Sequence, residues 1–120
     1  MKNGDKPSVL SAGSIKGTDV INPEGENIGK VHELMIDLDY GKVSYAVLQF
    51  GGFMGLGDKL FAIPWEAFGI NTKENEFILN VDKETLKNAE GFDKDNWPET
   101  ANYTWLDETY GYYGYDPYWR

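Results

Sequence analysis

Between residues 15 and 81 the chain is a succession of short strand-like segments separated by tight turns, and this pattern limits its fold more than any other feature. In residues 28–40 apolar and acidic side chains alternate, which is typical of a strand with one buried and one solvated face. The pattern places Leu34, Ile36, Leu38 and Tyr40 on one face and Glu33, Asp37 and Asp39 on the other. A turn at residues 39–42 then leads into residues 43–50, which are apolar on both faces and predict a central strand.

Three further segments predict strands: residues 15–21, 59–63 and 77–81. Pro64 ends the second of them, because proline has no N–H group to donate to a sheet. One helical turn is expected at residues 65–69, and a short helix at residues 83–90, with Asp82 as its N-cap and Gly91 as its stop. Five or six short strands joined by tight turns indicate an all-β protein that folds as a small antiparallel barrel.

A glycine-rich loop, GGFMGLGDK at residues 51–59, separates two of the expected strands. Its glycines have nearly the spacing of a phosphate-binding loop, but Asp58 stands where such a loop has lysine, and no serine or threonine follows Lys59. The loop also leads into a strand, whereas a phosphate cradle uses the N–H groups of a helix N-terminus. These differences exclude nucleotide binding. We expect a structural turn with three apolar side chains that act as plugs or contact points: Phe53, Met54 and Leu56.

The acidic face of the first hairpin strand, with Glu33, Asp37 and Asp39, is the strongest candidate for a hard-cation site or a general acid/base pair. We favour a solvated outer face, because nothing in the spacing obliges a third oxygen ligand to converge there. His32 is the only histidine and there is no cysteine, so a transition-metal site would need carboxylates for every other ligand. No serine lies in a nucleophile-elbow context. The sequence therefore predicts no catalytic residue, no cofactor and no bound metal.

The charge of the chain restricts its partners. Twenty acidic residues against 11 basic ones give a net charge of −9, and no segment gathers lysine or arginine into a patch. Such a field repels phosphate, so we expect neither nucleic acid nor an anionic membrane surface as a partner. No segment approaches the roughly 18 apolar residues that a membrane-spanning helix needs, and the polar start lacks the apolar run of a signal peptide. The expected location is the cytoplasm.

The C-terminal segment, residues 93–120, differs from the rest because it is acidic and rich in tyrosine and tryptophan, with no helical or strand period. Aromatic side chains at this density are expected to pack rather than to stay in solvent. The segment either covers its own barrel or docks on a neighbouring subunit or partner, since tyrosine and tryptophan dominate interface hot spots. The candidate interaction residues here are Trp105, Tyr110, Tyr112, Tyr113, Tyr115, Tyr118 and Trp119.

The order of these motifs resembles the PRC-barrel family. The residues that carry the resemblance are GKV at 29–31, ID at 36–37, GKVSYAVL at 41–48, the glycine loop at 51–59 and IPW at 63–65. The family is named for the cytoplasmic domain of the photosynthetic reaction-centre H subunit and also includes the C-terminal domain of a ribosome maturation factor. The resemblance implies a six-stranded β-barrel over residues 14–92, preceded by a flexible arm at residues 1–13. Residues 93–98 are similar to an extension of stand-alone bacterial members, and they begin the aromatic-rich C-terminal extension, residues 93–120.

The resemblance also implies an adaptor or assembly module, because members of that family share no catalytic residues. We therefore expect a non-catalytic protein that acts through protein–protein contacts and forms a homo-oligomer. Two alternatives stay open. One is a divalent-cation or small-ligand-binding protein that uses the face of Glu33, Asp37 and Asp39. The other is a ribosome-associated, maturation-type factor, which at a net charge of −9 would contact a basic ribosomal protein rather than RNA.

Overall fold

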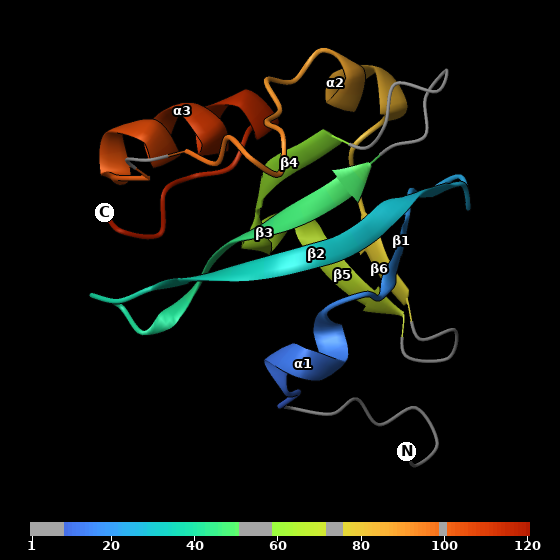
Figure 1. Ribbon diagram of the computed structural model, residues 1–120, viewed down its shortest axis with the longest axis horizontal. Coiled ribbons are helices and arrows are strands. Elements are labelled where there is room, and N and C mark those ends of the chain that lie inside the picture. The colour runs from blue at the N-terminus through green and yellow to red at the C-terminus, as the bar shows by residue number, and fades with distance from the viewer. Residues whose placement is uncertain (1–8, 51–58, 72–75, 99–100) are drawn as a thin grey trace.

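The computed structural model describes residues 9–50, 59–71, 76–98 and 101–120. Six strands form one strongly curled sheet in the order β4-β3-β2-β1-β6-β5, with helices placed around it (Figure 1). The strands are β1 (Asp19–Ile21), β2 (Asn27–Asp37), β3 (Lys42–Phe50), β4 (Lys59–Pro64), β5 (Phe68–Asn71) and β6 (Glu76–Leu79). The all-β class and the six strands confirm the prediction. The predicted antiparallel arrangement holds for the other pairs, but β1 pairs with β6 in parallel. No hairpin turn links these two strands, so turn geometry does not set their relative direction.

The hairpin of β2 and β3 is the longest feature of the sheet, and it projects beyond the other strands (Figure 1). The register between its strands shifts twice, at Val31/Glu33 and at Met35/Ile36. Each shift interrupts the alternation of side chains between the two faces. As a result Asp37 is only 8% exposed, whereas Ile36 on the predicted buried face is 53% exposed. The predicted assignment of faces is therefore wrong at the end of β2.

Strand β3 separates two apolar clusters, as its two apolar faces predicted. On the inner side of the curled sheet Ala46 and Leu48 join a core built from β1, β2, β4, β6 and three short helical elements, with Phe68 of β5 packed against it. On the outer side Tyr45 and Val47 join Leu60 and Ala62 of β4 in a second cluster. A strand with both faces covered is central, and burial of these side chains supplies most of the stabilisation of such a domain.

Three short helices flank the sheet. Helix α1 (Ala12–Ile15) begins at its N-cap Ser11 and occupies the start of the segment predicted as a strand, so that β1 begins only at Asp19. The 3₁₀ helix η2 (Trp65–Ala67) follows β4 where one helical turn was predicted, but it ends earlier than expected, because β5 begins at Phe68 and includes Gly69. Helix α2 (Lys83–Lys87) begins where it was predicted, because the Asp82 carboxylate accepts a hydrogen bond from the Thr85 N–H at 2.7 Å.

A fourth helical element, α3 (Tyr103–Tyr113), lies in the segment predicted to have no regular structure, and that prediction is wrong. The Asn102 side chain caps its start by accepting from the Trp105 N–H, and Gly114 ends it at φ +81°. Only Leu106 and Tyr110 of this helix are buried. Aromatic residues on the other sides of the helix hide this narrow apolar stripe in the sequence.

The loop with Phe53, Met54 and Leu56 and the first eight residues of the predicted arm lie outside the described residues. Among the residues that the structure describes, no helix is long and apolar enough to cross a membrane.

Candidate functional site

The C-terminal extension packs on its own barrel. Helix α3 lies against β4, and Leu106 and the fully buried Tyr110 complete the outer cluster over β3 and β4 (Figure 1). The Tyr110 hydroxyl donates to the main-chain carbonyl of Ser44 at 2.5 Å. Of the two arrangements that the aromatic composition allowed, the structure has the intramolecular one.

Asp37 anchors the rest of the extension at the end of β2. Its carboxylate accepts from the Tyr118 hydroxyl at 2.5 Å and from the Tyr103 hydroxyl at 2.9 Å. The main-chain N–H groups of Asp39 and Tyr40 also donate to it, at 2.9 and 3.1 Å. We call Asp37, Tyr103 and Tyr118 the aspartate clasp. It ties the hairpin to the start of α3 and to the last residues of the chain.

The protonation states of the clasp suit binding rather than proton transfer. Burial raises the pKa of Asp37, but the donated hydrogen bonds outweigh burial and hold the pKa below 3.8. Burial, and then the bond to Asp37, raise the pKa of Tyr118 to about 12 and shift the pKa of Tyr103 in the same direction. Near neutral pH the carboxylate therefore stays an acceptor and both phenols stay donors.

The three predicted carboxylates do not converge. Asp37 is used by the clasp, and the Asp39 carboxylate lies 3.3 Å from the Tyr103 hydroxyl. Glu33 pairs instead with Lys16 at 3.3 Å. Within the described ranges no three metal-ligating side chains lie together. The expectation that Asp37 belongs to a solvated face is wrong, because tyrosines from a distant part of the chain cover it. His32 is an exposed residue whose Nδ1 lies 3.3 Å from the Gln49 side-chain oxygen.

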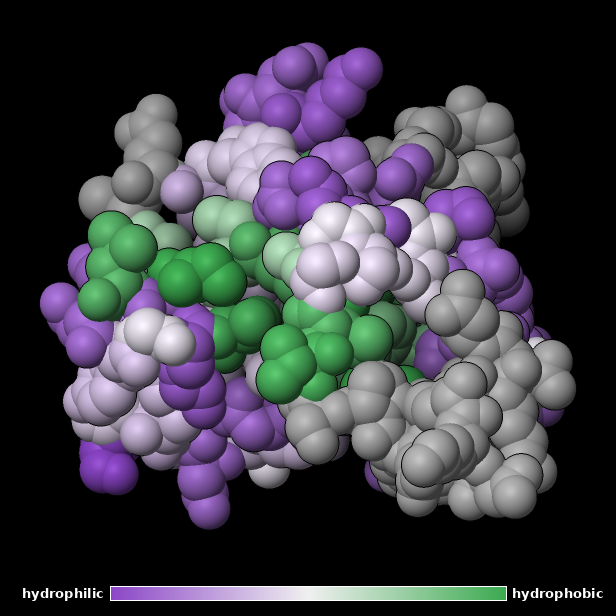
Figure 2. All heavy atoms as spheres, turned by 90° about the horizontal axis from the view of Figure 1, so that it is seen from below, coloured by the Kyte–Doolittle hydropathy of each residue, from purple (hydrophilic) through white to green (hydrophobic). Residues whose placement is uncertain are grey.

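Beyond the clasp, the end of the hairpin exposes three large apolar side chains: Ile36 at 53%, Leu38 at 92% and Tyr40 at 52%. We call these three residues the hairpin tip. Figure 2 shows apolar side chains gathered in a band on the face seen from below, and the band reaches the hairpin end of the molecule. Beside the tip, a hollow of about 460 Å³ lies between the hairpin and the start of α3. Sequence reasoning missed this surface, since the alternation in β2 assigned these side chains to the core.

The hairpin tip is held in place by the extension. The Tyr40 hydroxyl donates to the main-chain carbonyl of Trp119 at 3.1 Å, and its ring meets the Tyr103 and Tyr118 rings edge-on at 6.3 and 5.7 Å. Grouped apolar side chains on a surface mark contact sites in soluble proteins. The arrangement therefore presents an apolar surface in a fixed orientation.

Most of the predicted aromatic contact residues are partly or fully covered. Tyr110 is buried, and five others are half-buried: Trp105, Tyr113, Tyr115, Tyr118 and Trp119. Tyr112 is 46% exposed, although its hydroxyl donates to the Thr85 carbonyl at 2.6 Å. Their role as an interaction surface stays a prediction.

We expect Asp37→Asn to lower the free energy of unfolding by about 1–3 kcal/mol at pH 7, because an amide cannot accept from every donor of the clasp. The folded-state pKa of Asp37 is depressed, so its contribution is complete above its unfolded value of about 3.8 and is lost as the pH falls below it. Urea denaturation of the wild type and of Asp37→Asn at pH 7 and pH 3 measures this difference in the free energy of unfolding. The difference between wild type and variant should shrink at pH 3, whereas Asp116→Asn, at an exposed aspartate, should change little at either pH. An equal difference at both pH values would contradict an ionised Asp37.

The match to a family model agrees with this fold. The family model described as PRC-barrel domain matches residues 7–86, more than half of the chain, and ends within α2. No curated protein matches the chain. Among solved structures, a putative 16S ribosomal RNA processing protein RimM from Pseudomonas aeruginosa is similar at 17% identity and a TM-score of 0.44. The similarity covers 70% of this chain and 50% of that protein, so the chain spans about half its length. From the family match, the chain belongs to the PRC-barrel domain family.

Proposed function

We propose that this chain is a non-catalytic adaptor or assembly module that binds proteins through the hairpin tip, and that a second copy of the chain is one such partner. The observation that carries the proposal is the exposure of Ile36, Leu38 and Tyr40 together on a braced hairpin. Full burial of one large apolar side chain contributes about 1.5–3 kcal/mol, so these three can supply much of the energy of a modest interface.

The aspartate clasp supports this role because it orders the tip before a partner arrives. Binding by a mobile loop costs the entropy of ordering its side chains, about 0.5–1.5 kcal/mol each, and a surface that is already held avoids much of that cost. The hollow beside the tip offers space for a partner's side chain against Met35 and Leu106. Shape and apolar character thus favour protein contact at this end of the molecule.

The charge of the chain adds a condition on self-association. Two copies with a net charge of −9 repel each other, and salt screens that repulsion while leaving apolar contact intact. We therefore expect the fraction of oligomer to rise with ionic strength. An interface held by ion pairs would show the opposite trend.

Light scattering coupled to gel filtration tests the proposal. We expect a concentration-dependent mass above that of the monomer for the wild type, and at least about a tenfold weaker association for Leu38→Ser, since one buried leucine accounts for more than 1.4 kcal/mol. Ile70→Ser is the matched control, because Ile70 is an exposed apolar residue on the edge strand β5, which β1 and β6 separate from β2. A wild type that stays monomeric at every concentration and salt level would contradict the homo-oligomer.

The same pair of variants tests a partner other than a second copy. With the chain as bait in an affinity purification, a genuine partner of the tip should be retained by wild type and Ile70→Ser but lost from Leu38→Ser. Retention of the partner by the wild type and by both variants would mean that the partner binds outside the hairpin tip. The cation-binding and ribosome-associated alternatives stay predictions, and the involvement of Asp37 and Glu33 in other contacts weakens the first.

A further inference from the structure

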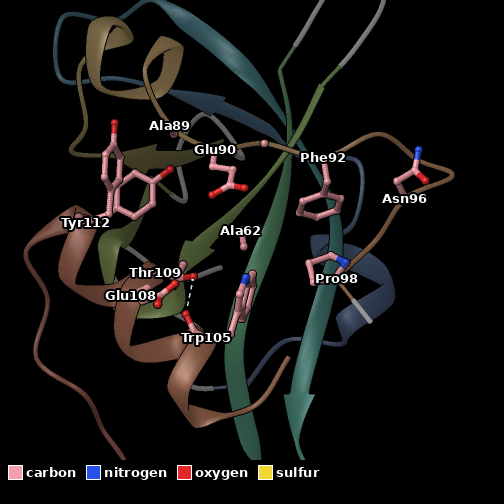
Figure 3. Close-up of a pocket in the computed structure, with 12 residues that line it drawn as sticks. Ala62, Ala89, Glu90, Phe92, Asn96, Pro98, Trp105, Glu108, Thr109 and Tyr112 are labelled. Carbon is pink, nitrogen blue, oxygen red and sulfur yellow. Dashed lines mark hydrogen bonds between the residues drawn. The ribbon is translucent and has the colours of Figure 1, made fainter. Parts of the chain in front are cut away.

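A second cavity lies on the other side of the extension, away from the hairpin tip. It has a volume of about 560 Å³ and opens between α3 and residues 89–98, with Ala62 of β4 among its lining (Figure 3). This volume falls within the range of pockets that hold small ligands, roughly 300–1,000 Å³. The family model ends at residue 86, so most of the lining belongs to the part of the chain outside the matched domain.

One wall of the cavity is a single face of α3. Trp105, Glu108, Thr109 and Tyr112 follow one another at spacings of three, one and three residues, which places them in one row along a helix. Phe92 stands on the other side, and Glu90 reaches in opposite Trp105 (Figure 3). The cavity therefore combines aromatic rings with carboxylates.

The charged groups of the lining are all acidic. They are Glu90 and Glu108, and no lysine, arginine or histidine is found among the described residues that line the cavity. Over the part of the chain that the structure describes, neither glutamate has an ion-pair partner. Both lie on a protein of net charge −9. This potential repels anions and attracts cations.

The walls are already held in position. The Trp105 ring meets the Tyr45 ring edge-on at 5.2 Å, and its carbonyl accepts from the Thr109 hydroxyl at 3.0 Å. On the opposite wall, Phe92 exchanges two main-chain hydrogen bonds with Leu60, at 2.8 and 2.9 Å. Pre-ordered walls lower the cost of binding a ligand.

We propose that this cavity binds an organic ammonium group. Aromatic faces attract such cations through the ring quadrupole, most strongly at tryptophan, and the two carboxylates supply the counter-charge. The group has two possible sources, a free quaternary amine or the lysine side chain of another protein. Their shared chemistry, a cation that carries apolar carbon, matches the mixed lining, whereas a bare metal ion would leave the rings unused.

A titration of the ¹⁵N-labelled full-length chain with choline tests the proposal, at constant ionic strength. The readouts are the Trp105 indole N–H, assigned by its loss in Trp105→Phe, and the main-chain N–H groups of residues 90–92 and 108–113. We expect saturable shifts with a dissociation constant on the order of 1 mM. The uncharged carbon analogue 3,3-dimethyl-1-butanol, of the same shape, should bind at least about fivefold more weakly.

Matched variants separate the local site from the general field of the protein. Glu90→Gln/Glu108→Gln should weaken choline binding by about three- to tenfold, since each exposed charge contributes modestly. Glu24→Gln/Glu84→Gln removes the same charge at two exposed positions outside the cavity, and should change binding less than about twofold. Trp105→Phe, which keeps a ring against Tyr45, should also weaken binding because tryptophan is the better cation partner.

The results of these titrations decide whether the cavity binds an ammonium group and which source supplies that group. No saturable shift up to about 100 mM choline, equal binding of the neutral analogue, or equal loss in both double variants would overturn it. A parallel titration with N-acetyl-lysine methylamide distinguishes the sources. Tighter binding of choline assigns a free quaternary amine, and tighter binding of the lysine derivative assigns a protein side chain. Because neither arm depends on the hairpin tip, failure here leaves the proposed function untouched.

Discussion

Replacing Tyr110 with alanine is expected to lower the free energy of unfolding by about 3–5 kcal/mol, the usual cost of removing a large aromatic side chain from a core. Tyr110 is fully buried between α3 and the outer cluster on β3 and β4. Its ring packs against Tyr118 and Trp119 at 5.8 and 5.0 Å, and its hydroxyl donates to the Ser44 carbonyl. The substitution therefore removes the contact that holds the extension on the barrel.

Urea denaturation followed by far-ultraviolet circular dichroism measures this effect. Tyr112→Ala is the matched control, since Tyr112 lies on the same helix but is 46% exposed, and it should cost about 1 kcal/mol or less. Tyr110→Phe keeps the ring and isolates the hydroxyl, at about 0.5–1.5 kcal/mol. Equal effects of Tyr110→Ala and Tyr112→Ala would show that the extension is not docked in solution.

Hydrogen exchange locates the same effect along the chain. In Tyr110→Ala the main-chain N–H groups of α3 should exchange faster than those of β2, since the extension loses its anchor while the inner core stays intact. Uniformly faster exchange would mean instead that barrel and extension unfold together.

Gly29→Ala is expected to lower the free energy of unfolding by about 2–5 kcal/mol, from backbone strain and overpacking together. Gly29 lies in β2 at φ +139°, a conformation that residues with a side chain rarely adopt. A Cβ atom there would stand 2.2 Å from the Gln49 carbonyl oxygen of β3. Because that oxygen belongs to the sheet backbone, it cannot rotate away as a flexible side chain could.

Gly13→Ala provides the matched control. A Cβ at Gly13 in α1 meets nothing within 4 Å, so this change should be neutral or stabilise by up to about 1 kcal/mol. Thermal unfolding of the two variants beside wild type makes the comparison. A Gly29→Ala protein as stable as Gly13→Ala would contradict the close approach of β2 and β3 at this point.

Local signals in the sequence were sufficient for several elements. The apolar run at residues 43–50 predicted β3, with both faces covered, and Asp82 predicted the start of α2. Both predictions depend on neighbouring residues alone. The strand follows from its run of apolar side chains, and the helix start follows from a side chain that accepts from an N–H group three residues later. Helix α3 was missed because its inward-facing positions, Leu106 and Tyr110, are lost among aromatic residues on its other sides.

The candidate contact surface depends on contacts that no local pattern contains. Asp37 was expected in solvent, yet it is buried by Tyr103 and Tyr118, which lie 66 and 81 residues further along the chain. The register shifts in β2 turned Ile36 outward, and they arise from its pairing with β3. Predictions on Phe53, Met54 and Leu56 fall outside the described residues.

The sequence by itself determined the all-β class and the hairpin with its central strand, because both depend on residue types at fixed short spacing. Only the tertiary structure decided that the aromatic extension packs on its own barrel and that the hairpin tip faces outward. It also decided that the Asp37 carboxylate accepts hydrogen bonds from Tyr103 and Tyr118. Burial and hydrogen bonding between distant segments are settled by how the whole chain packs, since the same carboxylate is solvated or buried according to what lies over it.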